Sequence, residues 1–297
     1  FIITLIAGGD WVEVEVRHSH RNIVRITKNQ EVVFEVEDKV DVIERADRSD
    51  LSIENIYDFA NEVELDRILP YAQRQIACNM AIAQRGMQGD YGIGIGKALL
   101  ETYTHSVYTK MRAYAAAASE ARMDGCDMPV IITSGSGNQG IASTVPVIVY
   151  AREKQIPEET MMRALVFSSL LTVYQKEFIG KLSAFCGAVS ASCASGAAIT
   201  YLVGGTLRQI KDTIDNTLAD IPGIICDGAK ASCAAKIATS VETAILSYEM
   251  AKRGRTFPFG EGLVETDYEQ TIRNYGRVAK DGMKSTDVEI LNIMIGK

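Results

Sequence analysis

Three cysteines and one glycine-rich segment are the residues of this sequence whose types and spacing could support chemistry. Cys226 and Cys233 lie seven positions apart in the segment ICDGAKASC, and Cys186 lies forty positions before Cys226. On an α-helix a spacing of seven returns to nearly the same face, two turns along. Thiolates bind metals and iron-sulfur clusters. Together with the segment SGSGNQG (Ser134 to Gly140), a turn that could hold an anion, the cysteines indicate an iron-sulfur enzyme.

The spacing also excludes several other cysteine sites. The sequence contains no Cys-x2-Cys zinc knuckle and no closely spaced ferredoxin run. Six cysteines in 297 residues are too few for a disulfide framework. A different interpretation is that the cysteines pack in a helical domain as small apolar side chains. Cys193 lies forty positions before Cys233, in a run of Gly, Ala and Ser, and is a further cysteine that could reach the same point.

The glycine-rich segment is predicted to form a strand-to-helix turn. The β-rich stretch from Pro129 to Thr133 precedes it, and the pattern from Ile141 onward is helical. Backbone N–H groups at such a turn face an anion, with the helix dipole behind them, so we expect a substrate carboxylate there. The amides of the segment could bind the carboxylate or the amino group. The predicted substrate-binding residues are Ser134, Gly135, Ser136, Gly137, Asn138 and Gln139.

A second glycine group, Gly92, Gly94 and Gly96, does not complete a dinucleotide-binding pattern. We interpret it as a close-packed turn.

Three segments resemble those of the L-cysteine desulfidase family, which is related to the iron-sulfur L-serine dehydratase alpha chains. They are SGSGNQGI (Ser134 to Ile141), KLSAFCGAVSAS (Lys181 to Ser192) and ICDGAKASCAAKIATS (Ile225 to Ser240), and the tail from Asp267 to Met294 has the family's closing pattern. The resemblance implies a lyase that carries out α,β-elimination on a small amino acid, with L-cysteine giving pyruvate, ammonia and sulfide. The alternatives are an L-serine dehydratase and a non-catalytic cluster-binding subunit.

The resemblance also implies the site residues. Cys186, Cys226 and Cys233 are expected to ligate a 4Fe-4S cluster with one iron open to substrate, and Cys193 is treated as packing and as the reserve ligand. Asp227 and Lys230, between two of these cysteines, are expected either to cap a helix or to orient substrate.

The catalytic residue remains unknown. Relatives carry an upstream motif similar to Gly-Cys-Thr-Glu-Pro, whose cysteine is thought to act as the acid/base, and the sequence contains no match to it. We therefore expect the base to lie upstream of Phe1, in a longer polypeptide or on another chain of a divided enzyme.

The predicted fold class is α+β, with a small N-terminal antiparallel β subdomain at residues 1–50 and a large, mostly α-helical domain at residues 51–297. Apolar and polar residues alternate from Phe1 to Glu35, which predicts about three strands. A charged link follows at residues 36–50, and Ser52 offers the first helix N-cap. The small-residue run from Lys181 to Thr200 is predicted to form the centre of the helical domain.

Composition limits the partners and the location. The net charge is −7, and lysine and arginine are scattered without a basic run, so nucleic acid is not expected. The sequence has no apolar stretch with membrane character, and 47% apolar residues can bury a sizeable core. Unpaired thiols and an oxygen-sensitive cluster predict a cytoplasmic protein. The expected partner is L-cysteine or L-serine, and the larger relatives suggest a possible homodimer.

Overall fold

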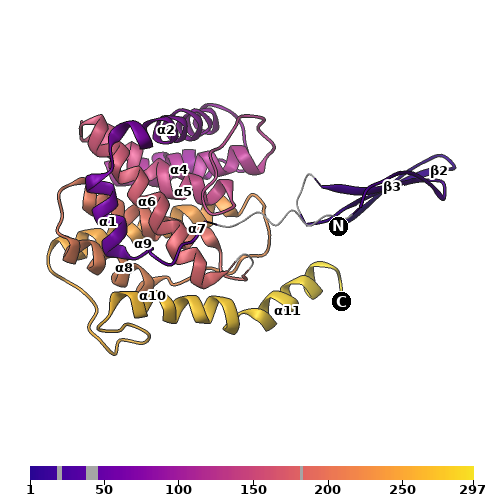
Figure 1. Cartoon of the computed structure of the whole chain (residues 1–297). Helices are drawn as coiled ribbons and strands as arrows, with labels where there is room; N and C mark the ends of the chain where they lie inside the picture. Colours follow the sequence, from indigo (N-terminus) through magenta and orange to yellow (C-terminus); the bar gives the residue numbers. More distant parts are fainter. Residues whose placement is uncertain (19–21, 38–45, 181–182) are drawn as a thin grey trace. The chain divides into compact units, whose positions relative to one another are not determined.

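The structure is a computed structural model that describes residues 1–18, 22–37, 46–180 and 183–297. The chain divides into two compact units, Phe1–Asp47 and Arg48–Lys297. The first is built of strands and the second of helices (Figure 1), so the predicted α+β class is confirmed. Residues 38–45 of the predicted charged link lie outside the described residues.

The β unit is an antiparallel meander of four strands in the order β1-β2-β3-β4. They are β1 (Ile2–Ala7), β2 (Asp10–Val16), β3 (Ile23–Lys28) and β4 (Glu31–Glu35). The expectation of about three strands was wrong because the chain reverses between β2 and β3 without a Gly or Pro signal. His18, with φ of 63°, takes the left-handed conformation there. Ile3, Val14, Ile26 and Phe34 pair in turn across the sheet and give it an apolar row.

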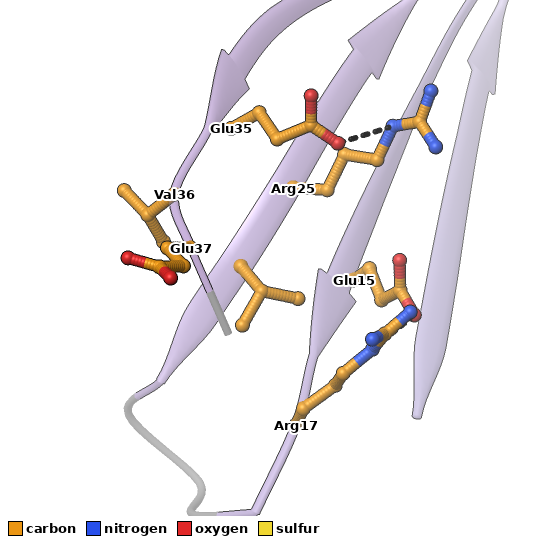
Figure 2. A pocket seen from close by; sticks show the side chains of 7 residues that line it. Glu15, Arg17, Arg25, Glu35, Val36 and Glu37 are labelled. Carbon is orange, nitrogen blue, oxygen red and sulfur yellow. Dashed lines mark hydrogen bonds and ion pairs between the residues drawn. The ribbon is translucent and has the colours of Figure 1, made fainter. Parts of the chain in front are cut away.

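A hollow of about 390 Å³ lies on this sheet (Figure 2). Its charged lining includes two ion pairs, Arg17–Glu15 at 2.6 Å and Arg25–Glu35 at 3.8 Å. Because these opposite charges already match one another, the hollow favours a structural role over ligand binding.

The helical unit contains the following elements: α1 (Ile53–Glu62), α2 (Leu65–Gln88), α3 (Ile95–Thr102), α4 (Val107–Met123), α5 (Gly137–Glu153), α6 (Glu158–Ile179), α7 (Gly187–Leu202), α8 (Leu207–Asp220), α9 (Cys233–Lys252), α10 (Tyr268–Arg277), the π-helical turn η1 (Val278–Gly282) and α11 (Lys284–Met294). Ser52 caps α1 by accepting the N–H of Asn55 at 3.1 Å, as predicted. None of the helices in the described part of the chain has the length and apolarity needed to cross a membrane.

Helix α5 packs against α2, α4, α6 and α7, and α7 packs against α5, α6, α8 and α9. Residues 137–151 of α5 and residues 188–200 of α7 are buried on every side. A helix that is apolar or small-sided all round is stable only inside a larger core. The predicted central position of the small-residue run is therefore confirmed from Gly187 onward, whereas residues 181 and 182 lie outside the described residues.

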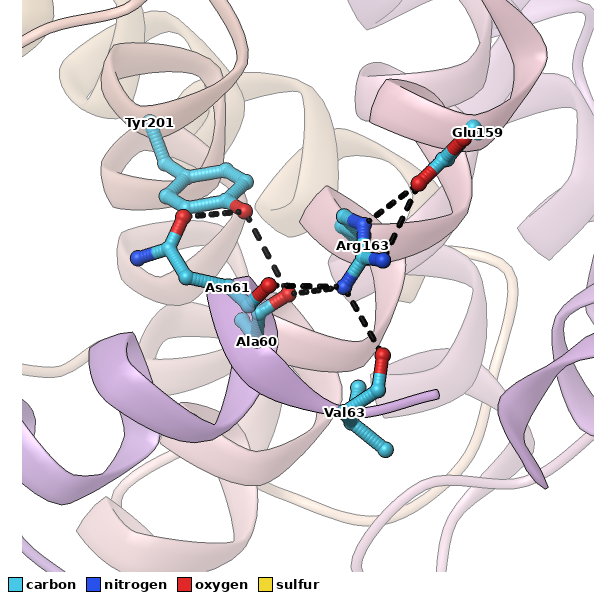
Figure 3. Close-up of polar contacts among 6 residues, drawn as sticks. All are labelled: Ala60, Asn61, Val63, Glu159, Arg163 and Tyr201. Atoms are coloured by element: carbon cyan, nitrogen blue, oxygen red, sulfur yellow. Dashed lines mark hydrogen bonds and ion pairs between the residues drawn. The ribbon is translucent and has the colours of Figure 1, made fainter. Parts of the chain in front are cut away.

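The end of α1 is fixed by a side chain from α6 (Figure 3). Arg163 donates from Nη1 to the carbonyls of Ala60, Asn61 and Val63, each at 3.0 Å, and its guanidinium also pairs with Glu159. The last carbonyls of a helix have no intrahelical partner, so this one cation satisfies them. These hydrogen bonds hold the end of α1 against α6.

Candidate functional site

The glycine-rich segment forms a tight turn followed directly by α5. Thr133 and Ser136 exchange two backbone hydrogen bonds of 3.2 Å, with Ser134 and Gly135 between them at φ of 54° and 87°. Positive φ at both central positions is typical of a type I′ turn. The turn is confirmed, but the strand predicted from Pro129 to Thr133 was wrong, and the helix begins at Gly137, four residues before Ile141.

A side chain takes the place of the missing strand partner. Asn79 of α2, which is fully buried, accepts the N–H of Ile131 at 2.9 Å and donates to Thr144 of α5 at 2.9 Å. A Cβ at Gly140 would lie 2.0 Å from the Ile131 carbonyl oxygen, so only glycine allows α5 to approach this segment. These contacts fix the first turn of α5.

The two amides of the segment have different surroundings. Asn138 accepts a hydrogen bond from Arg122 at 3.3 Å and points its amide nitrogen toward the sulfur of Met123 at 3.6 Å. Gln139 is only 7% exposed, and its Oε1 has no hydrogen-bond partner in the described residues. A buried acceptor without a partner is costly, which marks a place where a ligand donor can bind.

Gln139 connects this segment to the cysteine region. A Cβ at Gly187 would lie 2.5 Å from Nε2 of Gln139, so the amide rests against the first residue of α7. Cys186 is the N-cap of the same helix. The structure therefore brings the first turn of α5 next to Cys186, although the two segments are about fifty residues apart in the sequence.

Cys186 and Cys226 lie on two short extended segments that pair with each other. Phe185 and Ile225 form an antiparallel bridge, flanked by Cys186 N–H to the Ile224 carbonyl at 2.8 Å and Cys226 N–H to the Ala184 carbonyl at 2.7 Å. We call residues 184–186 and 224–226 the cysteine ladder. The expectation of one helical face for Cys226 and Cys233 was wrong, because Cys226 belongs to this ladder and α9 begins only at Cys233.

The thiols of the ladder are close enough to influence each other's protonation. The neighbouring Cys186 thiol lowers the pKa of Cys226 below its usual value, against the opposing effect of burial. The backbone N–H of Gly228 and the nearby Lys236 ammonium also favour this thiolate. The same interaction with Cys226, together with burial, raises the pKa of Cys186 above its usual range.

The third predicted ligand stands beside this pair. Cys233 is 8% exposed, and its sulfur accepts the N–H of Lys230 at 3.5 Å. Cys193 lies seven residues along α7 from Cys186, about 10 Å at 1.5 Å per residue. It is fully buried in the core, and burial raises its pKa to about 12.

The described residues contain no group of three or more His, Cys, Asp or Glu side chains arranged for a single metal ion. A preformed mononuclear site is therefore not present in this part of the chain. The thiolates of a cluster bind different iron atoms and need not point to one centre.

Asp227 joins the ladder to α9. Lys236 donates to the Ile225 carbonyl at 2.8 Å and to Asp227 at 2.6 Å, and Lys230 reaches the other carboxylate oxygen at 2.9 Å. The two ammonium groups hold the pKa of Asp227 well below its usual range. The sequence left two roles open for Asp227 and Lys230, helix capping and substrate orientation. In the structure the two side chains form an ion pair with each other.

Two lysines near the thiols were missed by the sequence reasoning. Lys236 follows Cys233 by three positions, one helical turn, a spacing that could have identified it. Lys176 lies on α6, where burial lowers its pKa and the sulfurs of Cys186 and Cys226 oppose this shift. Only the fold brings α6 to this place.

The second glycine group is a close-packed turn, as interpreted from the sequence. The buried Glu120 carboxylate accepts the N–H groups of Ile93, Ile95 and Gly96 at 3.0–3.2 Å. A Cβ at Gly96 would lie 2.6 Å from the Ala113 carbonyl oxygen of α4. The protein's own carboxylate thus occupies the start of α3.

Comparisons with known proteins cover nearly all of this chain. A family model described as "Serine dehydratase alpha chain" matches residues 18–292. A UPF0597 protein of Desulfitobacterium hafniense is 46% identical over 297 residues, which are 100% of this chain and 69% of the relative. UPF0597 proteins of Finegoldia magna and Treponema denticola are 45% and 46% identical over 96% and 97% of this chain, and 68% of each relative. The names of these relatives state no activity.

Proposed function

Because the chain belongs to the serine dehydratase alpha chain family, we propose that it is a lyase that carries out α,β-elimination on a small L-amino acid, with L-cysteine as substrate. The reaction removes the α-proton and releases sulfide from the β-carbon. The resulting enamine becomes an imine, which water hydrolyses to pyruvate and ammonia. The observation that carries the proposal is the contact between Gln139 and Gly187, which places an unpaired buried acceptor beside Cys186.

We propose that Cys186, Cys226 and Cys233 hold a 4Fe-4S cluster. Thiolates are the usual ligands of such clusters, the backbone segments of Cys186 and Cys226 pair with each other in the ladder, and the Lys236 ammonium favours the Cys226 thiolate. When bound, a cluster held by three thiolates supplies an iron with an open position, which acts as a Lewis acid on the leaving group.

The substrate's amino and carboxylate groups are bound by the first turn of α5. The unpaired Oε1 of Gln139 accepts an N–H of the substrate ammonium. The N–H groups of Gly137 and Asn138 belong to a helix start, where they have no intrahelical partner, and they bind the carboxylate. A substrate held in this way lies beside Cys186 at the start of α7.

L-Serine is the second candidate substrate. The observation that favours it is the description of the matching family, which names serine dehydratase. The two reactions share every step except the leaving group, which is sulfide from L-cysteine and water from L-serine.

The test is anaerobic reconstitution with iron and sulfide, followed by incubation with L-cysteine or L-serine and measurement of pyruvate and newly released sulfide. We expect pyruvate and sulfide in equal amounts from L-cysteine when the segment expected to carry the general base is supplied together with this chain. Cys226→Ser should lose the cluster absorption and the activity, whereas Cys78→Ser on α2 is the matched control and should keep both.

Gln139→Leu should keep the cluster absorption and raise KM, because it removes the amide oxygen that accepts the substrate ammonium. Pyruvate from L-serine alone would exclude the desulfidase activity. Cluster formation without turnover of either substrate, with that segment supplied, would identify a cluster-binding subunit.

A further inference from the structure

The segment that carries Cys186 is tied to the C-terminal helices by one hydroxyl group. Ser183 donates from Oγ to the Ala279 carbonyl at 2.7 Å, and the same Oγ accepts the N–H of Phe185 at 3.0 Å. Phe185 is the bridge residue of the cysteine ladder. Two consecutive hydrogen bonds therefore connect the C-terminal part of the chain to the residue next to Cys186.

Ala279 is the buried residue of the π-helical turn η1. A π-helical turn holds one extra residue, which changes the direction of its carbonyls and is frequent at functional sites. Here the turn separates α10, which packs closely on α6 with Gly276 against Phe178, from α11, which has no buried residue. The carbonyl that Ser183 uses is thus held on the packed side of the turn.

The cysteine ladder needs support from outside because it is short. One bridge and two flanking backbone hydrogen bonds join residues 184–186 to residues 224–226. On the second segment, Lys236 binds the Ile225 carbonyl and Asp227. On the first segment, Ser183 gives the corresponding support, because its Oγ accepts the N–H of Phe185.

We propose that Ser183 is a positioning residue that holds the Cys186 segment in register with the Cys226 segment by anchoring it to η1. The effect of Ser183 on the register of the ladder does not depend on any reaction. The effect of Ser183 on how long a cluster stays bound rests on the proposed function.

Amide hydrogen exchange in the metal-free chain tests the action on the ladder. In Ser183→Ala, the N–H groups of Cys186 and Cys226 should exchange about fivefold to thirtyfold faster, the range expected when one or two ordinary hydrogen bonds are lost. Ser183→Thr keeps the hydroxyl and should restore the original rates. The matched control is Ser192→Ala, because Ser192 donates only within its own helix, to the Ala188 carbonyl at 2.9 Å.

A second measurement is the half-life of the cluster absorption in air. Ser183→Ala should shorten it several-fold, and Ser192→Ala should not. Unchanged exchange at both cysteine amides in Ser183→Ala, or equal effects in Ser192→Ala, would overturn the inference. If the unaltered chain binds no iron at all, the proposed function fails, and the exchange rates still decide the role of Ser183.

Discussion

Replacing Asp215 by Asn should make the protein's stability less dependent on pH. Asp215 lies on α8 at 2% exposure, and its Oδ1 has no hydrogen-bond partner in the described residues. Burial raises its pKa from 3.8 to about 7, against the opposing hydrogen bond from Thr271. The nearby Asp212 raises this pKa further, while Arg208 lowers it.

The raised pKa fixes the sign of the effect. Between pH 3.8 and about 7 the folded state holds a proton that the unfolded state releases, so the free energy of unfolding falls as the pH rises through this window. A shift of about 3 units corresponds to roughly 4 kcal/mol, of which about 3 kcal/mol is lost between pH 5 and pH 8. By about pH 8 the loss is nearly complete.

Urea unfolding of the metal-free chain at pH 5 and pH 8, followed by circular dichroism, measures this loss. Asp215→Asn carries no titrating group at this position, so its stability relative to the original chain should be about 3 kcal/mol more favourable at pH 8 than at pH 5. Asp220→Asn, at the exposed end of the same helix, is the matched control. If Asp215→Asn and the original chain show the same pH dependence, the carboxyl does not titrate in this range and the reasoning is refuted.

Three further changes test other contacts. Gly187→Ala would place a Cβ 2.5 Å from Nε2 of Gln139, so we expect kcat/KM for L-cysteine to fall at least tenfold, about 1.4 kcal/mol, with the cluster absorption retained; unchanged kinetics would separate Gln139 from the substrate. Lys236→Met removes the 2.8 Å bond to the Ile225 carbonyl, and the cluster should be lost faster in air, so an unchanged half-life would contradict its role. Glu120→Gln removes the charge that accepts three N–H groups, which should lower the free energy of unfolding in urea by about 1–3 kcal/mol; unaltered unfolding would show that the turn holds itself.

Local patterns in the sequence predicted the fold class because they depend on neighbouring residues. Alternation in the first 35 residues indicated strands, and Ser52 marked the first helix start that the structure confirms. The number of strands was wrong where the signal was weak, at the reversal around His18. The strand predicted before the glycine-rich turn was wrong because no strand pairs with this segment among the described residues. The backbone N–H of Ile131 instead donates to the side chain of Asn79, about fifty residues away in the sequence.

Long-range contacts explain what the sequence could not predict at the candidate site. Nothing local to Cys226 shows that residues 224–226 pair with residues 184–186, so helical spacing gave the wrong relation to Cys233. Lys176 approaches the thiols only because α6 packs beside α7. The π-helical turn at Ala279 has no sequence signature either. Residue type suggested the chemistry, and tertiary packing decides which groups meet.

The close contact of α7 with α9 has an evolutionary consequence. A Cβ at Gly196 would lie 2.9 Å from the Cβ of Ala244, so neither helix has room for a larger side chain at this crossing. Cys186 caps the start of one helix and Cys233 begins the other. The distance between these two cysteines therefore depends on a pair of small residues several turns away. A lineage with a larger side chain at one of these two positions would need a smaller side chain at the other. Gly196 and Ala244 should vary together among relatives even where the cysteines themselves stay the same.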